Sequence, residues 1–340
     1  MTDIKVTVII PCFNNGVLLT EMIGCISRQT ITNWELIVVD DQSTDSSPNI
    51  VKEFEKNDKR IKLIVRNREP KGSATCRNIG FENAQGEYIM HLDADDLISD
   101  TCLEHRVKFL NQNLDIDYAS FPAKSFVNSR NKEEFILGDG TWGMGTNKDL
   151  LSCFLTVNYP FSGWTNIYRK KSIVKLPWDE NVKIYTDFSF IVPCILHGLK
   201  HKFSNTSNFD YYYRINYGSN NMCTSFVKPE KNKSTIYLFN KTLNSLSSKS
   251  DYKKRKKEFL QFVILHFERL VFDGKRKDLN IFLDFIYKQY HSQYILFYIV
   301  SKSTNTIKNK KFKRLIFLLL MIVLLGNKKH FIAIKNQIKL

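Results

Sequence analysis

Two segments of this chain end in clustered carboxylates directly after an apolar run. They are residues 36–45 (LIVVDDQSTD) and 88–96 (YIMHLDADD). Such runs fit buried strands of a parallel sheet, and ligands of open α/β sheets bind where those strands end. Clustered carboxylates repel one another and resist desolvation, so they need water, hydrogen bonds or a cation. The Asp-x-Asp pattern therefore favours a hard divalent metal beside a phosphate-bearing ligand.

Strand-like and helix-like segments alternate over the first hundred residues. Apolar runs predict strands, and Pro11 is expected to end the first because proline cannot donate to a sheet ladder. The expected strands are 6–10, 36–39, 61–65 and 88–92, and the expected helices are 16–29, 46–56 and 73–84. This order predicts an α/β fold with a doubly wound, mostly parallel sheet and flanking helices.

The pattern loosens after residue 100. A further strand is expected at 118–122, and ordered stretches at 183–196 and 209–215. Residues 128–150 are polar and contain glycine, which indicates a loop or flap. From about residue 229 onward, helical spacing dominates.

Charge divides the chain into two parts. The 340 residues carry a formal net charge of +16. Residues 1–227 hold 25 basic and 27 acidic side chains, net −2, whereas residues 228–340 hold 25 and 7, net +18. We therefore expect a sheet-containing domain at 1–227 and a basic, mainly helical region with another role at 228–340.

The cysteines point to a reducing compartment. There are seven, an odd number, and no Cys-x-x-Cys pair occurs, so neither a disulfide framework nor a zinc site is expected. The first residues run through Asp3 and Lys5 into a strand, without the pattern of a secretory signal. We expect a cytoplasmic protein.

Four motifs stand in order along the first hundred residues: VIIPCFN at 8–14, IVVDDQSTD at 37–45, RNIG at 77–80 and HLDADD at 91–96. Together they resemble the nucleotide-binding half of the large inverting glycosyltransferase family two, which has the GT-A fold. The resemblance covers about a hundred residues well and reaches more loosely to about residue 220. It implies a nucleotide-sugar donor, most simply a UDP-sugar, and Mg²⁺ or Mn²⁺ as cofactor.

The resemblance places five residues at the nucleotide: Pro11, Phe13, Asp41, Arg77 and Asp93. Phe13 would stack on a uracil ring, although a core phenylalanine is the alternative. Asp41 would accept a hydrogen bond from the base, while Asp40 supports the local backbone and Asp45 fits a helix cap or turn. Arg77 would contact phosphate or hold an aspartate, and a solvated helical arginine is the alternative.

Asp93 and Asp95 form the expected metal pair. Two carboxylates at i and i+2, leaving a strand end, can approach one cation that bridges two phosphates. The resemblance implies that Asp95 binds the metal directly and that Asp93 reaches the ribose or a metal-bound water. Asp96 would support them, and a plain acidic turn is the alternative.

Inversion requires a base that deprotonates the acceptor hydroxyl as it attacks opposite the leaving group. The family places this base about ninety residues after the metal motif, usually as the Asp of a Glu-Asp pair. Asp187 occupies that place, with Thr186 where the family has Glu. Asp179 and Glu180 are rival candidates, and a helix cap is the other interpretation of Asp187.

Three further residues are candidate phosphate or acceptor contacts. Arg214 and Ser219 follow the base segment, within or after a tyrosine-rich stretch that resembles the family. Trp164, with Trp142, would give an aromatic platform for an acceptor sugar, and ordinary packing is the alternative.

The basic third of the chain has three interpretations. Its charge suits nucleic acid, but no nucleic-acid-binding motif supports that partner, so none is expected. Basic residues 308–314 precede an apolar run of eleven residues at 315–325, too short for the about 20 residues of a spanning helix. This pattern suits a helix lying on the anionic inner face of the cytoplasmic membrane, and a buried helix is the alternative.

The preferred hypothesis is an inverting hexosyltransferase. It would move a sugar from a nucleotide diphosphate to a glycan or lipid-linked glycan in surface polysaccharide or lipopolysaccharide synthesis, at the inner membrane face. A catalytically silent nucleotide-sugar-binding or membrane-associated protein with the same fold is the alternative. A nucleotidyltransferase is a third hypothesis, but the glycine-rich phosphate loop expected of such an enzyme is missing after the first strand.

Overall fold

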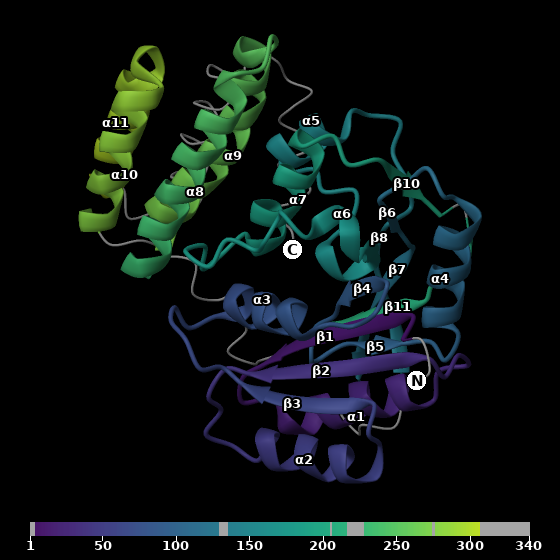
Figure 1. Cartoon of the computed structure of the whole chain (residues 1–340). Helices are drawn as coiled ribbons and strands as arrows, with labels where there is room; N and C mark the ends of the chain where they lie inside the picture. The colour runs from purple at the N-terminus through teal and green to yellow at the C-terminus, as the bar shows by residue number, and fades with distance from the viewer. Residues whose placement is uncertain (1–3, 129–134, 205, 216–227, 274–275, 307–340) are drawn as a thin grey trace. The chain divides into compact units, whose positions relative to one another are not determined.

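The computed structural model describes residues 4–128, 135–204, 206–215, 228–273 and 276–306 (Figure 1). The chain forms two compact units. The first comprises Met1–Leu151 and Tyr159–Ser219, and the second comprises Ser152–Asn158 and Asn220–Leu340. The short segment 152–158 belongs to the second unit, which the charge pattern did not predict.

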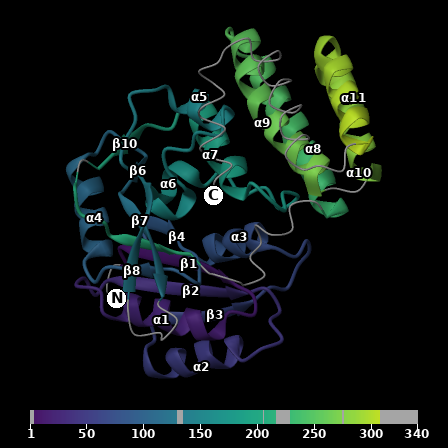
Figure 2. The ribbon, with the colours of Figure 1, turned by 180° about the vertical axis from the view of Figure 1, so that it is seen from behind.

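A seven-stranded sheet forms the centre of the first unit (Figures 1 and 2). All neighbouring pairs are parallel except those of β9, which runs antiparallel to both β4 and β6. In spatial order the strands are β10 (His201–Phe203), β6 (Tyr118–Ser120), β9 (Asn166–Arg169), β4 (Tyr88–His91), β1 (Val6–Cys12), β2 (Trp34–Asp40) and β3 (Ile61–Val65). The predicted mostly parallel sheet is confirmed.

Helices cover both faces of this sheet. The connections β1–β2 and β2–β3 run in one direction across it and β3–β4 runs back, so right-handed crossovers put α1 and α2 opposite α3. A β-carbon on Gly80 of α3 would lie 2.4 Å from Ile9 of β1, so glycine permits this close packing. The helices of the first unit are α1 (Gly16–Ser27), α2 (Ser47–Asn57), α3 (Ser73–Asn83), α4 (Cys102–Gln112), α6 (Lys170–Ile173) and α7 (Thr186–Leu196), with a 3₁₀ turn at Gly163–Thr165. A further short helix, α5 (Leu150–Leu155), begins in the first unit and continues into the segment 152–158 of the second.

Two details of the sequence prediction are wrong. β1 continues through Pro11 to Cys12, because β4 pairs with β1 only as far as Ile9 and the last residues of β1 pair with β2 alone. Proline is tolerated where one side of a strand is unpaired. Residues 128–150 also hold a strand, β8 (Phe135–Trp142), which forms an antiparallel hairpin with β7 (Ala123–Asn128).

This hairpin belongs to a second, four-stranded sheet in the order β5 (Leu97–Ile98), β11 (Tyr211–Arg214), β7, β8. β5 follows the acidic motif at 93–96 directly, and β11 pairs with it through Tyr211 and Tyr212. The small sheet therefore joins the acidic motif to a strand more than a hundred residues further along the chain.

The second unit is helical, as predicted. Its described helices are α8 (Pro229–Ser247), α9 (Tyr252–Asp273), α10 (Arg276–Gln289) and α11 (His291–Thr306). Phe239 of α8 contacts four other phenylalanine rings, two from α9 and two from α10. In the ranges that the structure covers, none of the helices has the length and apolar character needed to cross a bilayer. The predicted interfacial segment 308–325 lies outside the described residues.

Candidate active site

The carboxyl ends of β1 and β2 carry the expected nucleotide-binding residues. Phe13 directly follows β1 and is 46 % exposed, so it is not a core residue. The ammonium group of Lys71 lies 3.4 Å from the centroid of its ring. Asn14 has a left-handed backbone and accepts a hydrogen bond from the amide of Thr44, at 2.7 Å. The loops after β1 and β2 are therefore fastened together beside an exposed aromatic ring.

Asp41 lies at the end of β2 in a buried ion pair that the sequence interpretation missed. Its Oδ1 accepts a hydrogen bond from Nε of Arg66, whose side chain is 2 % exposed. Among the described residues, Arg66 gives the Asp41 carboxylate its hydrogen bond on Oδ1, so Oδ2 can accept one from a ligand. Arg66 follows β3, and β2 pairs with β3 in parallel, with Asp40 beside Val65. The sequence feature that could have indicated this ion pair is a basic residue, Arg66, one position beyond the end of the neighbouring strand β3.

The neighbouring acids have structural roles. Asp40 accepts the backbone amide of Ser43 at 2.9 Å and so supports the loop. Asp45 accepts the amides of Gly16 and Ser47, which begin α1 and α2. Burial alone would raise the pKa of Asp45, but the hydrogen bond from the hydroxyl of Ser47, together with those from the two amides, outweighs it and lowers that pKa. The predicted cap role of Asp45 is confirmed, and it serves two helices at once.

The acidic motif after β4 contains three carboxylates in different environments. Asp93 is half-buried, and its Oδ1 accepts a hydrogen bond from Nη2 of Arg77 at 2.7 Å. Asp95 meets no side-chain donor among the described residues, and burial together with the charge of Asp93 raises its pKa to about 6. Asp96 is fully buried and accepts the hydroxyl of Tyr211 at 2.5 Å and the amide of Arg214 at 2.7 Å. Asp96 therefore anchors the motif to β11 and leaves Asp93 and Asp95 toward the site.

Arg77 is buried, not solvated. Its guanidinium carbon lies 4.5 Å from the ring centroid of Trp178, and only 6 % of the residue is exposed. Besides the bond to Asp93, its Nε and Nη1 have no hydrogen-bond partner within the described ranges. Buried N–H groups without partners are costly, so a ligand that accepts hydrogen bonds would be stabilised here.

Asp187 is the second residue of α7 and shares this environment. Its Oδ2 accepts the amide of Gly163 at 3.1 Å. Burial raises the pKa of Asp187, the positive charge of Arg77 acts in the opposite direction, and Asp93 adds to the increase. These three side chains therefore lie within electrostatic reach of one another. The backbone of Tyr185, just before α7, is left-handed (φ 61°), a strained conformation of the kind found at functional sites.

The rival base Glu180 is occupied elsewhere. It pairs with Arg68 at 2.9 Å and accepts the amide group of Asn78 at 2.8 Å. Asn78 also exchanges two hydrogen bonds with the backbone of Trp178, which fixes the segment before α7 against α3. The side chain of Asp179 accepts the amide of Asn181, a local turn contact. The geometry favours Asp187 over both rivals.

The candidate phosphate and acceptor contacts Arg214, Trp164 and Ser219 remain to be placed. Arg214 is buried, and donates to the carbonyl of Asp95 and to Glu21, each at 2.6 Å; its Nη1 has no partner in the described part of the chain. Trp164 is 7 % exposed and stacks on Tyr211 and Tyr213. This contact is the packing alternative for Trp164, and an acceptor contact stays a prediction. Ser219 lies outside the described residues.

Asp93 and Asp95 fit a divalent cation that is shared with a ligand. No group of three or more His, Cys, Asp or Glu side chains suited to a metal gathers in the described ranges, so a protein-only site is not indicated there. Mg²⁺ and Mn²⁺ are commonly bound by one or two carboxylates, with phosphate oxygens and water as the other ligands. The carboxylate of Asp95, which burial and Asp93 disfavour as an anion, would gain from a cation beside it.

Comparisons with known proteins identify the family of this chain. A family model described as "Glycosyl transferase family 2" matches residues 7–176, half of the chain. An uncharacterized glycosyltransferase of Haemophilus influenzae is 41 % identical over 108 residues, which cover 32 % of this chain and 43 % of the relative. The poly(ribitol-phosphate) beta-glucosyltransferase of Bacillus spizizenii is 25 % identical over 277 residues, 78 % of this chain and 40 % of the relative.

A third relative is the UDP-Glc:alpha-D-GlcNAc-diphosphoundecaprenol beta-1,3-glucosyltransferase of Escherichia coli, 36 % identical over 36 % of this chain and 47 % of its own length. The chain thus spans less than half of each of these three relatives. The crystal structure of S. aureus TarS 1-349 in complex with UDP-GlcNAc superimposes with a TM-score of 0.66 at 20 % identity, covering 95 % of this chain and 92 % of that one. This likeness confirms the expected GT-A fold. On these grounds the chain belongs to glycosyl transferase family 2.

Proposed function

We propose that this chain is a metal-dependent inverting glycosyltransferase that moves a hexose from a UDP-sugar to a glycan or lipid-linked glycan of a cell-surface polysaccharide. The observation that carries the proposal is the convergence of Asp93, Arg77 and Asp187 at the carboxyl edge of the sheet. Asp93, one of the two acids proposed to hold a diphosphate-bound cation, thus lies within electrostatic reach of a carboxylate suited to act as a base.

The donor would bind at the ends of β1, β2 and β4. Phe13 offers an exposed ring for the base, and Oδ2 of Asp41 offers an acceptor that Arg66 holds in place. Lys71 occupies one face of the Phe13 ring and would be displaced by a stacking base or would close over it. The UDP assignment is supported by the E. coli relative, which is named for a UDP-Glc donor.

Asp187 would take the proton from the acceptor hydroxyl as that oxygen attacks the anomeric carbon. Burial raises the pKa of Asp187 and makes its carboxylate a stronger base than a solvated aspartate, while the positive charge of Arg77 favours its ionised form. The two nitrogens of Arg77 that lack partners, Nε and Nη1, would donate hydrogen bonds to oxygens of the nucleotide sugar. A bound Mg²⁺ or Mn²⁺, held by Asp95 and Asp93, would supply positive charge that stabilises the departing diphosphate.

The acceptor is proposed from the relatives and the charge distribution. The Bacillus relative is named for poly(ribitol-phosphate), and the E. coli relative for a diphosphoundecaprenol-linked acceptor. The net charge of +18 over 228–340 would hold the protein at the anionic inner face of the cytoplasmic membrane. Co-sedimentation with phosphatidylglycerol vesicles, but not with phosphatidylcholine vesicles, is the expected result, and equal sedimentation with both would contradict it.

The test of the catalytic assignment is donor turnover by Asp187→Asn. With UDP-glucose, UDP-N-acetylglucosamine and UDP-galactose as donors, release of UDP should fall by about 10²–10⁴-fold, because positioned general bases contribute that much. UDP affinity should stay unchanged. Glu180→Gln is the matched control and should remain within a few-fold of the wild type. Full activity of Asp187→Asn would overturn the assignment, and UDP binding without turnover in the wild type would support the catalytically silent alternative.

A further inference from the structure

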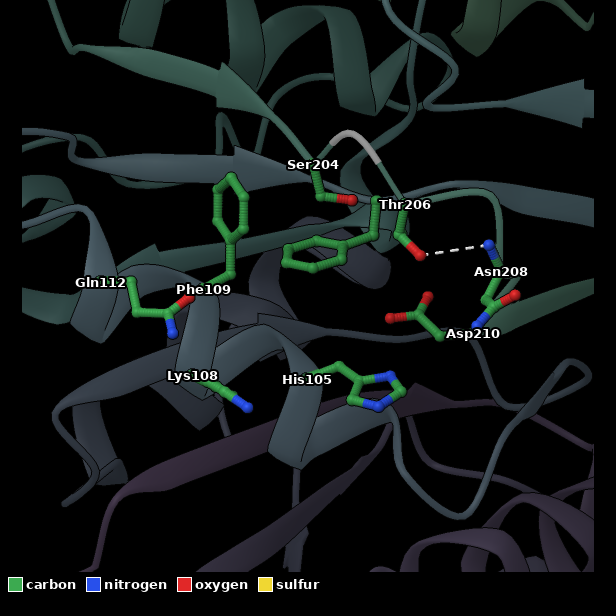
Figure 3. A pocket seen from close by; sticks show the side chains of 9 residues that line it. His105, Lys108, Phe109, Gln112, Ser204, Thr206, Asn208 and Asp210 are labelled. Carbon is green, nitrogen blue, oxygen red and sulfur yellow. Dashed lines mark hydrogen bonds between the residues drawn. The ribbon is translucent and has the colours of Figure 1, made fainter.

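A cavity of about 320 Å³ opens in the first unit between α4 and the segment that follows β10 (Figure 3). α4 contributes Lys108, Phe109 and Gln112 to its wall, and the segment contributes Ser204 and Asn208. None of these residues belongs to the proposed donor or base site. The cavity therefore has no role in the function described so far.

Its wall combines an aromatic surface with hydrogen-bonding groups, most of them neutral, together with the ammonium group of Lys108 and the imidazole of His105. Phe109 packs edge-on against Phe121, with ring centroids 5.4 Å apart, and both rings border the cavity. Asp210 also borders it, but both of its oxygens accept hydrogen bonds from the buried Arg106, at 2.9 and 2.7 Å. The acid is thereby neutralised, which disfavours a cationic ligand.

Ser204 gives a second and independent observation. It is only 6 % exposed, and its Oγ has no hydrogen-bond partner in the part of the chain that the structure describes. In Figure 3 its side chain lies at the wall, on the same side of the cavity as Thr206. A buried hydroxyl without a partner costs free energy, so a ligand hydroxyl that bonds to it would be stabilised.

Aromatic rings, amides and a hydroxyl are the groups that recognise a sugar ring. The apolar face of a pyranose packs on aromatic carbon, and its hydroxyls bond to amide and hydroxyl side chains. The volume lies near the lower end of the about 300–1,000 Å³ usual for small-molecule sites, which suits one or two sugar units and not a nucleotide-sugar.

The cavity is connected to the acidic motif by a short strand. Asp210 directly precedes β11, whose first residue, Tyr211, donates to Asp96. Arg106, which neutralises Asp210, also donates to the carbonyl of Trp164, the residue that stacks on Tyr211. The cavity and the reaction centre are therefore supported by the same strand.

We propose that this cavity binds a neutral sugar unit of the acceptor glycan, away from the unit that receives the new sugar. The proposal rests on the proposed function, because a polymeric acceptor has other units that such a subsite can hold. Gln112, Asn208 and Ser204 would bond to its hydroxyls, and Phe109 would support its ring. The subsite would raise the affinity for long acceptors without contributing to the chemical step.

The direct test measures binding of methyl β-D-glucopyranoside to the full chain by saturation-transfer NMR, with UDP and Mn²⁺ present. The double variant Gln112→Ala/Asn208→Ala should weaken binding about 10- to 30-fold, since each lost hydrogen bond accounts for about three- to six-fold. The control Asn57→Ala/Gln85→Ala changes exposed amides outside the cavity and should bind as the wild type does.

Three results would overturn the proposal: no binding of the glycoside, equal binding by the cavity variant, or preferential binding of glycerol phosphate, which would mark an anion site. A second readout separates this role from a merely structural one. The cavity variant should raise KM for a polymeric acceptor and leave kcat and the KM for a single-sugar acceptor unchanged. Failure of UDP to bind would refute the proposed function, while the glycoside result would still decide the cavity.

Discussion

Removal of the buried cation beside Asp41 should destabilise the first unit. In Arg66→Met the aliphatic length is kept, but Asp41, whose side chain is 8 % exposed, loses its only ion-pair partner among the described residues. Breaking a buried pair from one side costs about 3–5 kcal/mol. We expect the lower end, about 3 kcal/mol, because Glu69, the outer partner of Arg66, is 78 % exposed and water is therefore close.

For a domain of this size the loss corresponds to a decrease in Tm of about 6–12 °C. All four tryptophans lie in the first unit, so intrinsic fluorescence reports its unfolding and not that of the second. Arg68→Met is the matched control, because Arg68 is 37 % exposed and its pairs should be worth about 0–1 kcal/mol.

A double-mutant cycle completes the test. Asp41→Asn removes the charge that Arg66→Met leaves unpaired, so the double variant should be more stable than Arg66→Met alone, with a coupling of about 1–3 kcal/mol. UDP affinity should fall in both single variants, because Oδ2 of Asp41 is the proposed acceptor for the base. If Arg66→Met unfolds within about 2 °C of the control, less than 1 kcal/mol is involved and the reasoning from burial is refuted.

Three further predictions concern the site and its supports. The pKa of Asp95 is raised to about 6, so its carboxylate is mostly protonated below pH 6. The affinity for Mn²⁺ in the presence of UDP, measured by calorimetry, should therefore fall about tenfold from pH 7 to pH 5. Asp95→Asn should abolish this pH dependence. Asp45→Ala should lower the free energy of unfolding at pH 7 by about 1–2 kcal/mol in urea titrations, because the exposed carboxylate of Asp45 caps the first amides of two helices. Folding lowers the pKa of Asp45, so the difference between variant and wild type should shrink as the pH falls through that pKa. A difference that stays constant with pH would contradict this account. Gly163→Ala would bring a methyl group 3.0 Å from Oδ1 of Asp187 and so displace its carboxylate. In steady-state assays kcat should fall about tenfold, with the affinity for UDP unchanged. An unchanged kcat would mean that the position of Asp187 is not critical.

Much of the nucleotide-binding half could be predicted because its signals are local. The apolar runs that became β2 and β4 are continuous and end in acids, so strand, burial and strand end were visible together. β8 was not predicted, because its residues 135–142 contain two glycines and an aspartate, and its pairing with β7 specifies it more than its own pattern does.

Long-range partners were the other limit. Trp178 contacts Arg77 and exchanges hydrogen bonds with Asn78 across a hundred residues of chain, and no spacing rule connects them. Tyr211 reaches Asp96 over a still longer separation. Arg66 is different: had β2 and β3 been predicted as parallel neighbours, their register would have placed a basic residue beside Asp41.

The central claim is that Asp95 and Asp93 bind UDP through a divalent cation. Calorimetric titration of the full chain with UDP, with and without Mn²⁺, tests it most directly, with Asp95→Asn alongside. We expect binding in the wild type that strengthens at least tenfold with Mn²⁺, and a variant in which the metal has no effect. UDP binding that is the same with and without Mn²⁺, or a metal effect that survives in Asp95→Asn, would contradict the metal assignment, and no UDP binding in any condition would contradict the donor.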